Sequence, residues 1–360
     1  MTASTLQIYT PSGVLAKSAP LTLAAKRLKA LGFDVQIDEA ARARHQRFGG
    51  DDATRLAALH RVATAAPDIA LATRGGYGMT RLLDYIDWAL LGRSIERGTR
   101  WVGHSDLTVL QLGLLAQRKS GSDAIAWAGP MACDDFGRSD DLGGVDEVTR
   151  DCFVEAMSGV LEAVGFRTEA GLGRSSGDRR GLGGARLDAK ELDARKIDAK
   201  ELDSNELESN ELDEGMHGGG VHAEELDGLE VRGLLWGGNL CMVNSLLGTK
   251  YFPRIKGGVL FLEDVNEHPY RIERNLLQLH QAGVLDAQKA VVLGEFSAWR
   301  KVPLDRGFTM KSVVRHLRSI TKTPILTGLP FGHVPTKVTM PVGARVRLLV
   351  DGRNVLIGWD

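Results

Sequence analysis

Short apolar runs alternate with longer amphipathic segments over the first part of the chain. The apolar runs fall at residues 6–9, 33–37, 68–72, 100–102 and 124–127. This alternation is the order expected of a parallel β-sheet whose strands are joined by covering helices. In open sheets of this kind, ligands bind beyond the carboxyl ends of the strands. The pattern therefore predicts an α/β domain and directs attention to the turns that follow these runs.

A second set of apolar runs begins near residue 229, at residues 229–236, 258–263, 290–293 and 325–327, with an amphipathic segment at residues 269–281. These runs predict further strands and a helix. With 360 residues and 43% hydrophobic content, the chain is long enough to bury an extensive core and to form two domains.

Between the two sets, from about Leu187 to Leu212, the chain repeats a five-residue pattern of the type Leu-Asp-Ala-Lys-Glu. On a helix the successive leucines step around the axis by about 140°, so they form no continuous apolar stripe. A pentapeptide β-helix has the same period, but it requires a small residue where this chain has Lys or Asn. We therefore interpret residues 168–225 as a low-complexity insertion, mostly disordered or transiently helical, between domains at residues 1–167 and 226–360.

This insertion contains residues of types that can bind a metal. His217 and His222 lie close to Glu224 in the sequence. The glycines around these residues leave them without a preorganised geometry. We therefore predict no metal and no cofactor.

The charge balance excludes several classes of partner. The chain has 45 Lys and Arg residues against 46 Asp and Glu residues, and no basic stretch interleaves with aromatic residues. We expect no nucleic-acid partner and no membrane partner. The N-terminus lacks a basic start followed by an apolar stretch, which predicts a cytoplasmic protein. Three widely spaced cysteines are typical of reduced thiols rather than of a disulfide framework.

The turn Gly103-His104-Ser105-Asp106 follows the predicted strand at residues 100–102 and precedes a helical stretch. A serine on a tight strand-to-helix turn has an exposed hydroxyl, and the amides that open the helix can stabilise an oxyanion. The alternative is that Ser105 or Asp106 simply caps the helix. A second glycine-rich turn, residues 73–78, follows the neighbouring predicted strand, so both turns are expected at the same edge of the sheet.

Two further residues complete a possible catalytic set. Glu263 lies at the end of an apolar strand, where a buried carboxylate requires a cationic or hydrogen-bonding partner. His333 lies on a loop between Gly-Pro turns and the last strands. Together, Ser105, Glu263 and His333 have the chemistry of a serine activated by an imidazole that a carboxylate orients. An α/β-hydrolase is disfavoured, because Leu107 occupies the position where that fold carries glycine.

Five short motifs of the chain, taken together, resemble those of a known family. The blocks that carry the resemblance occur in order: Arg74-Gly75-Gly76-Tyr77-Gly78, Gly103-His104-Ser105-Asp106, Gly237-Gly238-Asn239-Leu240, Leu262-Glu263-Asp264-Val265 with Glu267, and Gly332-His333. They are similar to the successive blocks of the LD-carboxypeptidases, the muramoyltetrapeptide carboxypeptidase family of serine peptidases. The similarity covers nearly everything except the repeat insertion.

The resemblance implies a flavodoxin-like parallel-sheet N-terminal domain and a smaller α/β C-terminal domain, with the active site between them. It implies Ser105 as nucleophile, Glu263 as acid and His333 as base, and it implies a homodimer. The oxyanion hole would come from backbone amides, which we place at Asp106 and at the Gly75-Gly76 turn.

The implied reaction is hydrolysis of the bond between the L-centre of a diamino acid and the terminal D-Ala of a cytoplasmic muropeptide during cell-wall recycling. Arg74 is our candidate for binding the D-Ala carboxylate, against the alternative of a salt bridge. Asn239 is a candidate for peptide binding, with helix capping as the alternative. Ala128 departs from the family, whose members often have histidine before the Gly-Pro-Met turn.

Two other functions stay open. A branch of the family hydrolyses peptide-nucleotide antibiotics and confers self-immunity, and it would share the same three residues. A non-catalytic binding module on the same fold is the third hypothesis, although the presence of all three catalytic residue types argues against it.

Overall fold

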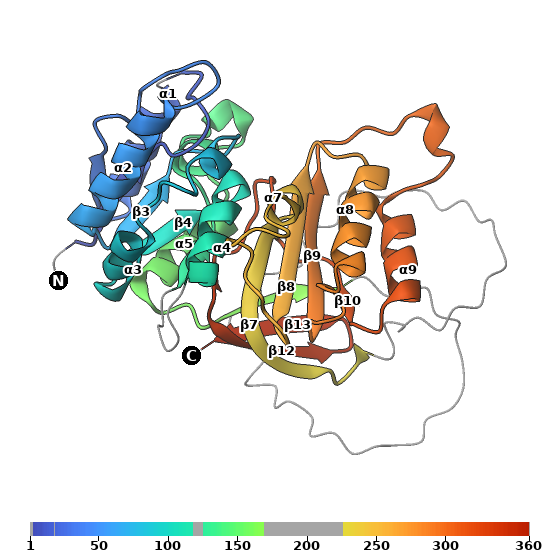
Figure 1. The fold of residues 1–360 in the computed structure, drawn as a ribbon. Coiled ribbons are helices and arrows are strands. Elements are labelled where there is room, and N and C mark those ends of the chain that lie inside the picture. The colour runs from blue at the N-terminus through green and yellow to red at the C-terminus, as the bar shows by residue number, and fades with distance from the viewer. Residues whose placement is uncertain (1–2, 18, 118–124, 169–225, 360) are drawn as a thin grey trace.

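The computed structural model describes residues 3–17, 19–117, 125–168 and 226–359. The repeat insertion therefore lies outside the described residues, apart from Thr168 at its start. The described part folds into two sheets that lie side by side, each covered by helices (Figure 1). The α/β fold class predicted from the sequence is confirmed.

The first sheet has strand order β2-β1-β3-β4-β5 followed by β11 (Met340–Val342), and its first five strands are parallel. This order is that of flavodoxin-like folds. Its elements are β1 (Thr5–Tyr9), α1 (Ala19–Ala30), β2 (Asp34–Ile37), α2 (Asp52–Ala65), β3 (Ile69–Ala72), η1 (Met79–Arg81), α3 (Trp88–Glu96), β4 (Arg100–Gly103), η2 (Ser105–Leu107), α4 (Thr108–Gln117), β5 (Ala126–Ala128), η3 (Ala132–Phe136), η4 (Asp140–Leu142) and α5 (Glu147–Ser158).

Alternation along the strands divides the core of this domain between the two faces of the sheet. Ile8 and Val102 pack with α1 and α5, whereas Tyr9 and Trp101 pack with α2, α3 and α4. Because successive side chains of a strand point to opposite faces, strands buried on both sides are apolar throughout. That is why β3, which is buried along its whole length, appeared in the sequence as an unbroken apolar run.

The second sheet has strand order β10-β9-β8-β7-β12-β13-β6. Its elements are β6 (Ala163–Arg167), β7 (Glu230–Asn239), α7 (Leu240–Ser245), β8 (Val259–Val265), α8 (Pro269–Gln281), β9 (Ala290–Ser297), η7 (Pro303–Asp305), α9 (Met310–Ile320), β10 (Ile325–Leu326), β12 (Arg345–Asp351) and β13 (Asn354–Trp359). Strands β7 to β10 are parallel, and α8 and α9 lie along one side of them (Figure 1).

The two sheets exchange a strand across the boundaries that we expected from the sequence. β6 lies within residues 1–167, yet it pairs antiparallel with β13 in the second sheet. β11 (Met340–Val342) lies within residues 226–360, yet it pairs antiparallel with β5 at the edge of the first sheet. The chain thus passes from the first sheet to the second before β6, and returns to the edge of the first sheet at β11.

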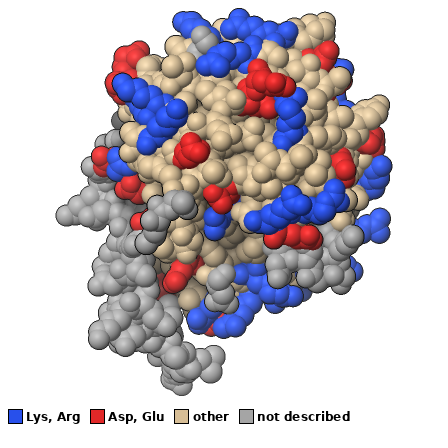
Figure 2. Space-filling view, turned by 90° about the vertical axis from the view of Figure 1, so that its left-hand side faces the viewer, with Lys and Arg blue, Asp and Glu red and all other residues tan. Residues whose placement is uncertain are grey.

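Charged side chains of both signs are dispersed over the face shown in Figure 2, with broad uncharged areas between them. None of the helices in the described ranges is long and apolar enough to cross a bilayer.

Candidate active site

Ser105 occupies a strained turn immediately after β4. Its φ is +62°, in the left-handed region that residues with a side chain rarely adopt. Such a conformation costs on the order of 1–3 kcal/mol and persists only where the surroundings hold it. The side chain is 9% exposed, and the helical turn η2 begins at this residue. The geometry is that of a nucleophile elbow rather than of an ordinary helix cap, for which an extended residue is required.

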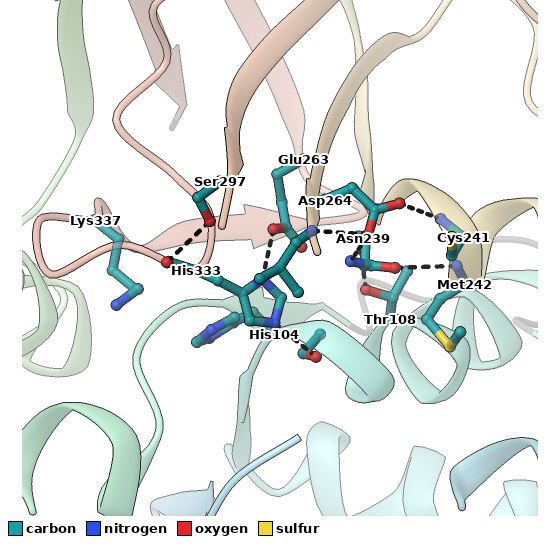
Figure 3. Close-up of polar contacts among 12 residues, drawn as sticks. His104, Thr108, Asn239, Cys241, Met242, Glu263, Asp264, Ser297, His333 and Lys337 are labelled. Atoms are coloured by element: carbon teal, nitrogen blue, oxygen red, sulfur yellow. Dashed lines mark hydrogen bonds and ion pairs between the residues drawn. The ribbon is translucent and has the colours of Figure 1, made fainter. Parts of the chain in front are cut away.

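Three side chains from different parts of the chain form one hydrogen-bonded series at the junction of the domains. The Nε2 atom of His333 lies 2.8 Å from the Ser105 hydroxyl oxygen, and its Nδ1 atom lies 2.8 Å from Oε2 of Glu263. Figure 3 shows Glu263 at the end of its strand and His333 directly below it. Ser105 follows β4, Glu263 lies in β8, and His333 lies in the loop after β10.

Burial and charge set the protonation of this series. Glu263 is fully buried, and its Oε1 atom has no hydrogen-bond partner within the described chain. Burial alone lowers the pKa of His333, but the hydrogen bond and the charge of Glu263 more than offset this and raise that pKa above its usual value. The arrangement stabilises the imidazolium that forms when His333 takes the serine proton.

A second imidazole, which our sequence reasoning assigned no role, lies beside the first. The ring of His104 is 5.0 Å from that of His333, in an edge-to-face arrangement, and its Nδ1 lies 2.8 Å from the carbonyl oxygen of Gly129. Burial, together with the positive charges of His333 and Lys337, lowers the pKa of His104 well below its usual range. His104 is therefore neutral while His333 carries the mobile proton. The only sequence signal for it was its position beside the nucleophile.

The glycine turn after β3 lies directly against the nucleophile. A Cβ atom on Gly75 would fall 2.6 Å from both Cβ and Oγ of Ser105 and 3.5 Å from the backbone nitrogen of Asp106. Gly76 has φ +108°, a backbone conformation that favours glycine. The structure thus brings together the backbone at Gly75 and Asp106, where we expected the oxyanion hole. The carboxylate of Asp106 accepts a hydrogen bond from the Met79 amide at 2.8 Å and so ties the two turns together.

Gly237 and Gly238, which precede Asn239, allow β7 to approach its neighbours closely. A Cβ atom on Gly237 would lie 1.9 Å from the carbonyl oxygen of Phe261, and one on Gly238 would lie 2.5 Å from Oγ1 of Thr108. The Asn239 side chain caps α7 by accepting from the Met242 amide at 3.2 Å.

Its amide nitrogen donates to Asp264 at 3.0 Å (Figure 3). Of the two alternatives for Asn239, helix capping is thus what the structure shows, and one amide N–H is left for other contacts.

Arg74 follows β3 and is half-buried. One guanidinium nitrogen donates to the Val14 carbonyl at 3.1 Å, and its Nε atom lies 4.0 Å from the carboxylate of Asp134. Arg74 thus lies near an acid, as the salt-bridge alternative requires, while its side chain is 38% exposed. Binding of a carboxylate by Arg74 stays a prediction.

A buried ion pair that sequence reasoning missed fastens the loop that carries His333. Lys337 pairs with Asp135, and the two side chains are 3% and 6% exposed. The other oxygen of Asp135 accepts from the Met131 amide at 2.7 Å. The Lys337 amide donates to the hydroxyl of Thr149 at 2.8 Å. Residues after His333 are therefore fixed to the first domain from two sides.

In the described ranges, no group of three or more His, Cys, Asp or Glu side chains is arranged to hold a metal ion. The set that we weighed at His217, His222 and Glu224 lies outside those ranges.

Comparisons with known proteins agree on one family. The family model of the LD-carboxypeptidase N-terminal domain matches residues 6–122, and that of the LD-carboxypeptidase C-terminal domain matches residues 232–348. The crystal structure of muramoyltetrapeptide carboxypeptidase from Oxalobacter formigenes is 32% identical with a TM-score of 0.75, and the match covers 99% of both chains.

More distant relatives have related names. The murein tetrapeptide carboxypeptidase of Pseudomonas aeruginosa is 26% identical over 88% of this chain and 84% of its own length. The probable murein peptide carboxypeptidase of Bacillus subtilis is 24% identical over 96% and 90%. The structure of the microcin C7 self immunity protein MccF in the wild-type apo state is 18% identical, with a TM-score of 0.72 over 100% of this chain and 97% of its own. At that identity it supports the fold alone.

Proposed function

This chain belongs to the LD-carboxypeptidase family, and we propose that it is a serine-type peptidase that releases the terminal D-Ala from murein tetrapeptides. The observation that carries the proposal is the hydrogen-bonded series Ser105, His333 and Glu263, which ends at a serine in a strained turn. The family and the names of the relatives support a peptidase that acts on murein peptides. The serine mechanism, the substrate, a cytoplasmic location and a homodimer are our proposals.

In this mechanism His333 removes the proton from the Ser105 hydroxyl as the oxygen attacks the carbonyl carbon of the scissile bond. The same imidazole, now protonated, gives that proton to the leaving amine of D-Ala. Water then attacks the acyl-enzyme, with His333 again as general base, and regenerates the serine. Glu263 holds Nδ1–H of the ring, so that Nε2 faces the hydroxyl.

The tetrahedral intermediates carry an oxyanion that requires nearby donors. We assign this role to the backbone amides of Asp106 and of Gly75 and Gly76. The support is positional, because Gly75 lies against Ser105, Gly76 follows Gly75 in the same turn, and Asp106 directly follows the nucleophile. Arg74 is assigned to the terminal carboxylate, whose geometry its guanidinium matches. The amide N–H that Asn239 has left is assigned to a carbonyl of the bound peptide.

A second candidate function comes from MccF, a protein of the same fold whose structure was solved in complex with glutamyl sulfamoyl guanosine. That function is hydrolysis of a peptide-nucleotide conjugate by the same three residues. It would use a different pocket lining and leave the chemistry at Ser105 unchanged.

The test is to incubate the purified protein with a murein tetrapeptide and, separately, with an aminoacyl-nucleotide analogue, and to measure released D-Ala or amino acid. We expect release of D-Ala, and loss of that release in S105A. Turnover of the nucleotide analogue alone would favour the second function. An active protein whose S105A variant keeps more than a tenth of its activity would contradict the serine mechanism.

A further inference from the structure

Two oppositely charged side chains flank the nucleophile from the neighbouring strands of the first sheet. β4 lies between β3 and β5 in that sheet, so the turn of Ser105 lies between the loops that follow β3 and β5. Arg74 comes from the first of these loops and Asp134 from the second. A backbone hydrogen bond of 2.8 Å from the Cys133 amide to the Thr73 carbonyl joins the two loops. Arg74 and Asp134 therefore lie near each other, and Arg74 immediately precedes Gly75, the glycine that lies against Ser105.

Contacts within the described part of the protein leave part of the hydrogen-bonding capacity of both Arg74 and Asp134 without a partner. The Nε atom of Arg74 and the carboxylate of Asp134 are 4.0 Å apart, at the outer limit of an ion pair. The two side chains are 38% and 46% exposed, and Nε of Arg74 has no hydrogen-bond partner in the described structure.

Asp135, the residue after Asp134, has a different environment. Asp135 is buried, and its carboxylate is occupied by Lys337 and by a backbone amide. One carboxylate of this acidic pair thus holds the fold, and the other remains open beside the site.

We propose that Asp134 is a specificity determinant that binds an ammonium group on the substrate residue preceding the scissile bond, while Arg74 binds the terminal carboxylate next to it. This inference rests on the proposed function. Within that function it adds one residue, Asp134, that would recognise the side-chain amine of the diamino acid.

The electrostatics of the position favour a cationic ligand. Burial by the surrounding protein and the charge of Asp135 raise the pKa of Asp134 to about 6, although Arg74, His333 and Lys337 act in the opposite direction. A carboxylate whose charged form is disfavoured gains more from an incoming ammonium group than a fully hydrated one does.

An uncharged substrate side chain packed at the same place would cover this carboxylate, which is 46% exposed in the free protein, and would leave it without a partner. Discrimination by unsatisfied polar groups is much stronger than discrimination by lost apolar contact. Asp134 is therefore suited to reject substrates that lack the amine.

The test uses two tetrapeptides that differ only in the side-chain amine of the diamino acid, which is free in one and acetylated in the other. We expect the wild-type protein to prefer the free amine in kcat/KM by about tenfold or more, as for one charge-assisted hydrogen bond. In D134N this ratio should fall close to one. The matched control is D141N, which removes an exposed carboxylate from η4 and should keep the wild-type ratio.

The ratio also has a pH dependence that a merely structural role would not produce. Titration of His333 affects both substrates equally and cancels in the ratio, whereas protonation of Asp134 weakens only the free-amine substrate. The preference should therefore decline as the pH falls through about 6, the pKa of Asp134.

A preference that D134N retains, or one that D141N loses equally, would overturn this inference while leaving the proposed function intact. Failure of the wild-type protein to cleave either peptide would instead contradict the proposed function.

Discussion

Replacing Gly75 by alanine should inactivate the enzyme without unfolding it, because the added methyl group meets only the nucleophile and its turn. A Cβ atom at this position falls 2.6 Å from Cβ and from Oγ of Ser105. Carbon atoms in favourable contact are about 3.5–4.0 Å apart, so the two side chains must separate by about 1 Å. The backbone of Gly75 has no positive φ, and the effect is therefore steric rather than conformational.

A displacement of Ser105 by this amount is large compared with the length of the hydrogen bond between Ser105 and His333. Ser105 Oγ lies 2.8 Å from Nε2 of His333, and a shift of about 1 Å would leave no hydrogen bond at that distance. Misplacement of a reacting group by this amount costs about 100-fold in rate. We expect kcat for D-Ala release to fall by at least that factor in G75A, together with slower labelling by a serine-directed phosphonate.

The matched control is G92A, which adds a methyl group within α3 where nothing lies within 4 Å. It should leave kcat unchanged and raise the free energy of unfolding by up to about 1 kcal/mol, the difference in helix propensity. If G75A retained more than a third of the wild-type turnover, the close contact between the glycine turn and Ser105 would not determine the position of the nucleophile.

The remaining predictions concern the catalytic series and the ion pair behind it. S105A should lower kcat by about 10⁴ to 10⁶-fold with an unchanged thermal unfolding curve, and S105A combined with H333A should be little worse than S105A alone, as a quenched D-Ala assay would show. E263Q should cost less than H333A in kcat. Because Glu263 raises the pKa of His333 and the base acts unprotonated, the rising limb of the profile of kcat/KM against pH should move to lower pH in E263Q. K337M should lower the free energy of unfolding in urea by about 3–5 kcal/mol, since it leaves a buried carboxylate without its cation, and K337M combined with D135N should recover part of this loss.

Much of the fold could be predicted because the signals for it are local. Strands β1 to β4 lie within a residue or so of the apolar runs in the sequence, and α8 has the bounds that its periodicity predicted. The turn at Ser105 could be predicted for the same reason, since a strand, a glycine and a helical stretch follow one another directly. Glu263 stood out because a carboxylate at the end of a buried strand needs a partner.

The features that could not be predicted are those that depend on contacts between distant residues. β11 has three residues and includes a proline, so it carries too little pattern to indicate a strand, and it exists because it completes the edge of the first sheet beside β5. Nothing in the sequence marks Lys337 or Asp135 as buried, because charged residues are usually exposed. Their burial follows only from the packing of the last loop against the first domain.

These non-local contacts explain how a catalytic series divided between two domains can keep hydrogen-bond geometry. Ser105 follows β4 of the first sheet and Glu263 lies in β8 of the second, so any relative movement of the sheets would act directly on the His333 ring between them. The His333 loop is held from both directions. Ser297 at the end of β9 donates to the His333 carbonyl at 3.2 Å, and Lys337 is bound to Asp135 in the first domain. Because β11 follows this loop and pairs with β5, the segment that carries the base is part of both domains, and its position is set by both sheets together.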